Sequence, residues 1–205
     1  MTFSIVKKNI SVVIINDLLK RYNCPVPFHQ FRTILIGFII SPIKSMPPLE
    51  IIKKIWGGKL PNFENIDQLS SFMNDVFMSY WNNLTDHRNS KLPFYFSPIK
   101  IKESDKSLSD LCRIRREEIG GLLFGLMSGD ENNEFSQTIQ KSIAHLEEIW
   151  GYFEATYDLI QKNGIGKNQK EISNMTFLLK DMEKIAQIEI NELINNCAIE
   201  NHTKH

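Results

Sequence analysis

The stretch that most constrains the fold is the apolar run from residue 119 to 129, which reads IGGLLFGLMSG. Its apolar side chains recur at helical spacing, yet three glycines lie inside it, and each interior glycine costs a helix roughly 1 kcal/mol relative to alanine. Gly121 and Gly125 lie four residues apart, so they form one bare strip where another helix backbone can approach closely. The run therefore predicts a buried helix in a helical core, and it carries no reactive group.

Apolar side chains at steps of three and four residues predict helices along most of the chain. Prolines, glycines and capping residues place the helix ends. Asn65 is the expected cap of the helix at 66–84, Ser107 or Ser109 caps the helix at 108–128, and residues 200–205 are expected to be frayed. The expected helices are residues 11–22, 28–40, 49–56, 66–84, 108–128, 136–162 and 168–198. Residues 86–106 are the least helical part, and the short alternation in 99–102 has no partner strand. The predicted fold class is all-α, a helical bundle of about seven helices.

The non-helical region divides the chain into two expected helical lobes. Residues 1–90 form the N-terminal lobe, residues 91–106 an extended linker, and residues 107–205 the C-terminal lobe with its long last helix. The two lobes are expected to pack as one compact unit. Residues 35–41 and residues 123–129 also resemble each other: each is an apolar helical stretch that contains a glycine and is followed by a turn. This similarity reflects either two related helical hairpins or chance.

The charge of the chain is balanced overall and uneven along its length. Residues 1–116 hold 17 basic and 9 acidic residues, a formal net charge of +8, whereas residues 117–205 hold 7 and 15, a net charge of −8. Either the two halves attract each other, or the basic half faces an acidic partner or nucleic acid. The basic stretch 100–116 is the best nucleic-acid candidate, and its candidate contacts are Arg113, Arg115 and Arg116.

The sequence shows no membrane span and no signal peptide, and this predicts a cytoplasmic protein. The longest apolar run, residues 34–40, has seven residues, far fewer than the roughly 20 that span a membrane. The N-terminal apolar stretch is too short for a signal peptide and has no small-residue cleavage site. The three widely spaced cysteines indicate reduced thiols in a cytoplasmic protein.

Several short motifs point to a known family. They are the glycine-containing apolar helix from Ile36, the Ser41-Pro42 turn, Met46-Pro47-Pro48, the closing Ile55-Trp56-Gly57, Trp81-Asn82, and the run from Gly121 to Gly125. Together they resemble the YecA/YgfB-like family of uncharacterised bacterial proteins, over most of residues 34–157. The chain departs from the family in two places. It lacks the cysteine-rich metal-binding motif that ends many longer relatives, and it has Thr33-Ile34 near the place where the family has a Gly-Phe pair. The resemblance implies an all-α fold and a soluble bacterial protein, and it implies no activity.

The sequence predicts no catalytic, cofactor or metal site. Cys112 lies near three arginines but also among apolar residues, which favours a buried and inert thiol. The leading hypothesis is a non-enzymatic protein–protein interaction or regulatory module that works through a groove between the lobes. The candidate surface is Trp56, Trp81, Asn82, Phe94, Tyr95, Phe96 and Trp150. Alternatively, residues 94–96 are an apolar patch that docks the linker on the core. The expected partner is another protein, with the last helix a candidate for homodimerisation, and the alternative is a nucleic-acid-associated regulatory factor.

Overall fold

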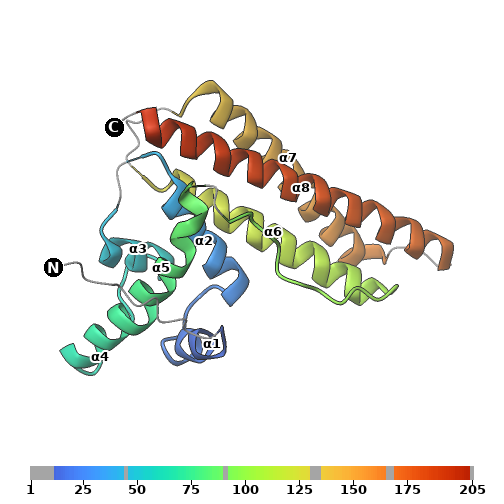
Figure 1. The fold of residues 1–205 in the computed structure, drawn as a ribbon. Coiled ribbons are helices and arrows are strands. Elements are labelled where there is room, and N and C mark those ends of the chain that lie inside the picture. The colour runs from blue at the N-terminus through green and yellow to red at the C-terminus, as the bar shows by residue number, and fades with distance from the viewer. Residues whose placement is uncertain (1–11, 44–45, 90–91, 130–134, 165–168, 204–205) are drawn as a thin grey trace.

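The computed structural model describes residues 12–43, 46–89, 92–129, 135–164 and 169–203, and these form helices and loops without strands. In chain order the elements are α1 (Val12–Arg21), α2 (Phe28–Ile40), α3 (Pro48–Ile55), α4 (Ile66–Ser71), the π-helix η1 (Phe72–Met78), α5 (Ser79–Leu84), the 3₁₀-helix η2 (Thr85–Asn89), α6 (Asp105–Met127), α7 (Gln137–Asn163) and α8 (Gln169–Thr203). Because α4, η1, α5 and η2 follow one another without a break, the described chain forms seven helical rods (Figure 1). The predicted all-α fold is confirmed.

Capping explains where the rods begin. Asn65, the predicted cap of α4, accepts a hydrogen bond from the Gln68 backbone nitrogen at 2.9 Å. The predicted caps of α6, Ser107 or Ser109, are wrong. Ser104 has an extended backbone and accepts a hydrogen bond from the Ser107 nitrogen, so α6 begins at Asp105. An N-cap residue needs this non-helical backbone, which Ser107 and Ser109 do not have inside the helix.

The predicted 66–84 helix contains one irregular part. Residues 72–78 form a π-helix, in which the Ser79 hydroxyl donates to the Asn74 carbonyl oxygen five residues earlier. Phe72 and Phe77 are also five residues apart, and both side chains are buried in the core. Five residues rotate an ordinary α-helix well past one full turn, whereas the wider π-turn brings both rings to one side.

The centre of the fold is the contact between α2 and α6. A Cβ atom placed on Gly125 would lie 2.1 Å from the Ile34 carbonyl oxygen, and one on Gly37 would lie 2.2 Å from the Leu122 carbonyl oxygen. On Gly121 it would lie 2.5 Å from the Thr33 hydroxyl oxygen. The two helices therefore touch backbone to backbone, as the glycine spacing in residues 119–129 predicts. The similar runs at 35–41 and 123–129 supply the two glycines that face each other.

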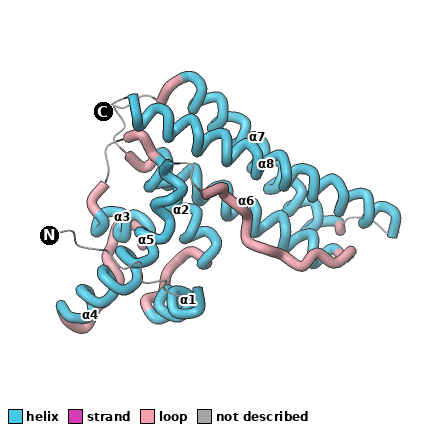
Figure 2. The backbone as a smooth tube through the Cα atoms, viewed as in Figure 1, coloured by secondary structure: helices cyan, strands magenta, loops and turns pink. Residues whose placement is uncertain are grey.

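The remaining helices are arranged around this contact. α6, α7 and α8 are long and lie side by side, and α1 and α5 contact α2 (Figure 1). α3 buries Ile51, Ile52 and Ile55 in the core, and α4 lies at the outer end of the rod that continues into α5. The extended segment 92–104 runs along α6 (Figure 2). Buried apolar side chains from both predicted lobes belong to one continuous core. Within the described ranges, no helix is both long enough and apolar enough to cross a membrane.

The C-terminal end differs from the prediction that residues 200–205 are frayed. α8 continues to Thr203, the last described residue. The Asn201 side chain donates to the Ile40 carbonyl oxygen at 3.3 Å, and the Ser136 backbone nitrogen donates to the Glu200 carboxylate. These contacts hold the last turns of α8 on the end of α2 and the start of α7.

Candidate functional site

The predicted aromatic groove is not one continuous surface. The Phe94 and Phe96 rings are buried and meet edge to face, and only Tyr95 between them points to solvent. An extended segment places alternate side chains on opposite sides, so one face of 94–96 enters the core. The proposal that Phe94 and Phe96 line an open groove is therefore wrong.

The tryptophans of the predicted groove have separate environments. Trp56 is half-buried and donates its indole N–H to the Tyr22 carbonyl oxygen at 2.9 Å. Trp81 is half-buried and stacks on Phe77, and the adjacent Asn82 is half-buried too. Trp150, on α7, is more exposed and lies over Gly120 of α6. Trp56 and Trp81 thus pack within the N-terminal rods, whereas Trp150 covers the outside of α6.

The three candidate nucleic-acid arginines are paired with carboxylates. Arg113 makes ion pairs with Glu117 at 3.0 Å and Asp110 at 3.6 Å. Arg116 pairs with Glu154 and lies over the Tyr157 ring, 5.0 Å from its centroid. These ion pairs neutralise the positive charges of Arg113 and Arg116, which the sequence analysis proposed as contacts to the phosphates of a nucleic acid.

The Arg115 side chain is buried, unlike those of Arg113 and Arg116. Its guanidinium donates to Glu118 at 2.5 Å, to Glu183 of α8 at 2.7 Å and to the Ser97 carbonyl oxygen at 2.9 Å. It also lies 4.6 Å from the centroid of the Phe96 ring. A nucleic acid cannot reach this group without opening the core, so the prediction of Arg115 as a nucleic-acid contact is wrong.

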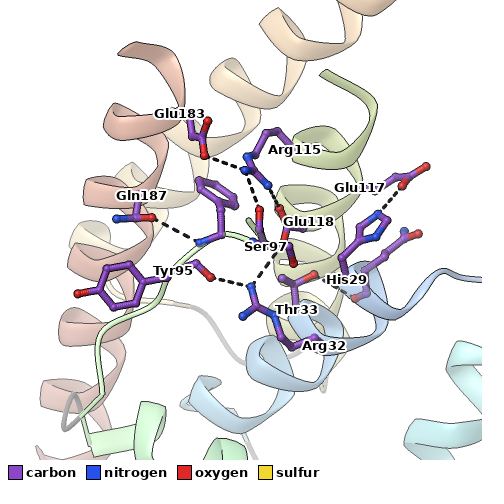
Figure 3. A network of polar contacts seen from close by, with 12 residues as sticks. His29, Arg32, Thr33, Tyr95, Ser97, Arg115, Glu117, Glu118, Glu183 and Gln187 are labelled. Atoms are coloured by element: carbon purple, nitrogen blue, oxygen red, sulfur yellow. Dashed lines mark hydrogen bonds and ion pairs between the residues drawn. The ribbon is translucent and has the colours of Figure 1, made fainter. Parts of the chain in front are cut away.

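The Arg115 pair belongs to a polar network that joins four parts of the chain (Figure 3). The buried Glu118 carboxylate also accepts the Ser97 backbone N–H at 2.9 Å and lies 3.4 Å from the Arg32 guanidinium of α2. Arg32 donates to the Tyr95 carbonyl oxygen at 2.7 Å. The network therefore fixes segment 92–99 between α2, α6 and α8.

A second pair extends the network along α2. His29 and Glu117 approach to 2.6 Å, and Arg113 donates to the same carboxylate. Burial by itself would raise the pKa of Glu117, but the hydrogen bond with His29 and the charge of Arg113 hold that pKa below its usual value. Glu117 therefore stays ionised, and its charge is matched by its neighbours.

A cleft of about 820 Å³ opens beside this network, and we call it the α2–α5 cleft. α1, α2, α5, η2, segment 92–99 and α6 all contribute to its walls. The apolar walls include Phe28, Leu84, Leu92, Ile99 and Ile114, and the polar groups include His29, Arg32, Tyr80, Asn83 and His87. Apolar walls with a few converging polar groups are typical of ligand sites of this size.

Two titratable groups of the cleft have perturbed pKa values. Burial lowers the pKa of His87, although its hydrogen bond to the Leu92 carbonyl oxygen opposes the shift. Because a carbonyl only accepts, His87 Nδ1 carries the proton in this 2.9 Å bond, and Nε2 of the neutral ring is an acceptor. Burial also raises the pKa of Tyr80, which the nearby Arg32 charge partly offsets. Both side chains are therefore neutral at pH 7.

A different feature lies on the outer face of α8. Five large apolar side chains there are between 56% and 69% exposed, and we call them the α8 apolar stripe: Phe177, Leu178, Ile185, Ile188 and Ile199. The opposite face of α8 is buried, with Leu179, Ile190 and Leu193 in the core. The predicted surface did not include this stripe, although its spacing is visible in the sequence.

The three cysteines are free and carry no sign of reactivity. Burial raises the pKa of Cys112 and Cys197 to about 12 and that of Cys24 to about 11. The expected inert state of Cys112 agrees with this environment. Among the residues that the structure describes, no cluster of three or more His, Cys, Asp or Glu side chains could hold a metal ion.

The fold thus defines an all-α protein with a buried ionic network, one mixed apolar and polar cleft, and an uncovered apolar helix face. No family model, curated protein or solved structure matches the chain. The resemblance to the YecA/YgfB-like family therefore stays a prediction.

Proposed function

We propose that this chain is a non-enzymatic protein–protein interaction module, and that its partner docks on the α8 apolar stripe. The observation that supports this is the exposure of five large apolar side chains along one face of a 35-residue helix. Single exposed apolar residues are ordinary, but several gathered on one face of a helix mark an interaction surface. The side chains of the stripe offer contact area and no group for bond chemistry.

The chemistry of the stripe favours an amphipathic helix with basic residues as the partner. Ile185, Ile188 and Ile199 share their face with Glu192, which is exposed and makes no ion pair with a described residue. α8 as a whole has three lysines and six acidic residues, a formal net charge of −3. A helix with apolar side chains at steps of three and four residues and a Lys or Arg opposite Glu192 complements this face.

The expected affinity is modest. Complete burial of a Leu, Ile or Phe side chain contributes about 1.5–3 kcal/mol, so burial of the exposed part contributes roughly 1–2 kcal/mol for each residue of the stripe. The sum over the five residues is on the order of 5–9 kcal/mol, against an association cost of about 4–15 kcal/mol. Apolar contact alone therefore gives weak binding, and the charge contact with Glu192 is needed for a specific complex.

We also propose that the protein acts in the cytoplasm. Its three cysteines are free, and Cys112 and Cys197 are buried. Secreted proteins of this size commonly pair their cysteines, whereas reducing compartments keep them as thiols.

Fluorescence anisotropy with synthetic helical peptides tests the proposal. One labelled peptide has apolar residues at helical steps and a central lysine, and its match has glutamate in place of that lysine. We expect the lysine peptide to bind about tenfold more tightly than the glutamate peptide, a difference of about 1.4 kcal/mol. The variant Ile185→Glu with Ile188→Glu should lose this binding, whereas Leu159→Glu, an exposed site on α7, should bind as the wild type does.

Three outcomes of this experiment count against the proposal. Absence of peptide binding overturns the docking role of the stripe. Equal binding by the Ile185/Ile188 variant places the binding elsewhere. Sedimentation that shows a dimer, lost in the same variant, makes a second copy of the chain the occupant and overturns the basic-helix partner.

A further inference from the structure

The α2–α5 cleft is separate from the α8 apolar stripe, and its size and walls suit a small molecule. Its volume of about 820 Å³ lies within the range of roughly 300–1,000 Å³ typical of ligand pockets. Phe28 of α2, Ile99 of the extended segment and Ile114 of α6 all line it. The side chains of three different elements thus form an apolar wall for an uncharged part of a ligand.

Arg32 supplies the cleft with a cation that shares its ion-paired carboxylate, Glu118, with Arg115. Its nearest carboxylate, Glu118, lies at 3.4 Å and is held more closely by Arg115 at 2.5 Å. The Arg32 Nε atom is buried and so does not face the cleft, whereas its Nη1 atom makes no hydrogen bond with a described residue and is the donor left for a ligand. Since guanidinium carries five N–H donors, Arg32 retains donors for an added anion.

The guanidinium of Arg32 is also held in place before any ligand arrives. Its Nη2 atom donates to the Tyr95 carbonyl oxygen at 2.7 Å, and its central carbon lies 5.3 Å from the centroid of the Phe94 ring. A fixed planar guanidinium binds a carboxylate through two parallel hydrogen bonds and loses little side-chain entropy on binding. The side chain is 21% exposed, so it lies at the boundary between the network and the cleft.

Neutral polar groups lie around the same space. Tyr80 and Asn83 line the cleft, and neither side chain hydrogen bonds to a described residue. His87 presents a ring that burial keeps neutral, and its Nδ1 donates to the Leu92 carbonyl oxygen. The nearby Glu117 is matched by His29 and Arg113, so it does not cancel the charge of Arg32.

We propose that the α2–α5 cleft binds a small amphipathic organic acid. The carboxylate of the ligand pairs with Arg32, Tyr80 and Asn83 donate hydrogen bonds to it, and its apolar body lies against Phe28, Ile99 and Ile114. An alcohol of the same length lacks the charge that Arg32 requires, and an amine of the same length is repelled by it. This site is independent of the partner proposed for α8.

Titration of the full chain with octanoate, octanol and octylamine tests the site, with binding followed by methyl chemical shifts of the cleft residues. A hydrogen-bonded charge pair contributes about 1.5 kcal/mol or more, so octanoate should bind at least about tenfold more tightly than octanol. Arg32→Gln should remove that preference. The matched control is Arg88→Gln, an exposed arginine of the adjacent η2 helix, which should leave it unchanged.

A second pair of variants guards against a folding defect in Arg32→Gln. Leu92 lines the cleft and is exposed, so the fold tolerates a charge there. Leu92→Glu should weaken octanoate binding about threefold or more, and Leu92→Lys should strengthen it, because only the sign of the added charge differs. Equal binding of octanoate and octanol, absence of methyl shifts, or the same effect from both Leu92 variants would overturn the proposal.

Discussion

Gly125→Ala tests the backbone contact between α2 and α6. The added Cβ atom would lie 2.1 Å from the Ile34 carbonyl oxygen and 2.9 Å from the Phe38 nitrogen. Nonbonded contacts of carbon need roughly 3.5 Å, so the helices must separate by about 1.4 Å at this point. A gap of about 1 Å already removes up to half of each dispersion contact, and this contact lies at the centre of the core.

The expected loss of stability follows from two opposing effects. Overpacking of a tight core costs about 3 kcal/mol, and alanine returns about 1 kcal/mol of helix propensity. The net loss is about 2 kcal/mol, which lowers the melting temperature of a chain of this length by roughly 4–8 °C. Thermal and urea unfolding followed by far-UV circular dichroism measure both quantities.

Gly151→Ala is the matched control for this variant. Gly151 lies inside α7, and a Cβ atom there would meet nothing within 4 Å. The same substitution should therefore raise stability by about 1 kcal/mol through helix propensity alone. If Gly125→Ala melts at or above the wild-type temperature, the two helices do not depend on a bare backbone contact, and the reasoning is refuted.

Two further variants test the buried polar groups by urea unfolding. Because the pKa of His87 is lowered in the fold, the unfolded chain binds the proton first as pH falls below about 6.5, so stability decreases there. His87→Gln should flatten this decrease, and an unchanged slope would contradict the assignment. Arg115→Met leaves the buried Glu118 carboxylate without its closest partner and should cost about 3–5 kcal/mol; a loss below about 1 kcal/mol would show that the pair is unimportant.

The helices and the close approach of α6 to another helix are predictable from the sequence, because both depend on local signals. Apolar spacing marks each rod, and Asn65 caps α4 as its residue type suggests. Which helix packs against Gly125 could not be predicted from local signals. The partner helix is α2, whose Gly37 lies inside a similar apolar run. The sequence alone did not decide whether that similarity reflects two related hairpins or chance.

The polar network is not predictable from the sequence, because its members are distant along the chain. Arg113, Arg115 and Arg116 look equivalent in the sequence, yet only Arg115 receives Glu183, 68 residues later, and becomes buried. His29 and Glu117 are 88 residues apart. His29 and Arg32, three residues apart at the start of α2, are a local sign of a polar face on this helix.

α2 and α6 touch in the fold but lie far apart along the sequence, and this distance affects how the chain folds during synthesis. The Ser41 hydroxyl bonds to the Leu126 carbonyl oxygen across 85 residues, so the apolar face of α2 leaves the ribosome long before its cover exists. At about 5–20 residues per second, that delay lasts roughly 4–17 s. During this time α1, α3, the 66–89 rod and segment 92–99 are the described parts that precede α6, so the face of α2 that α6 covers stays exposed to solvent.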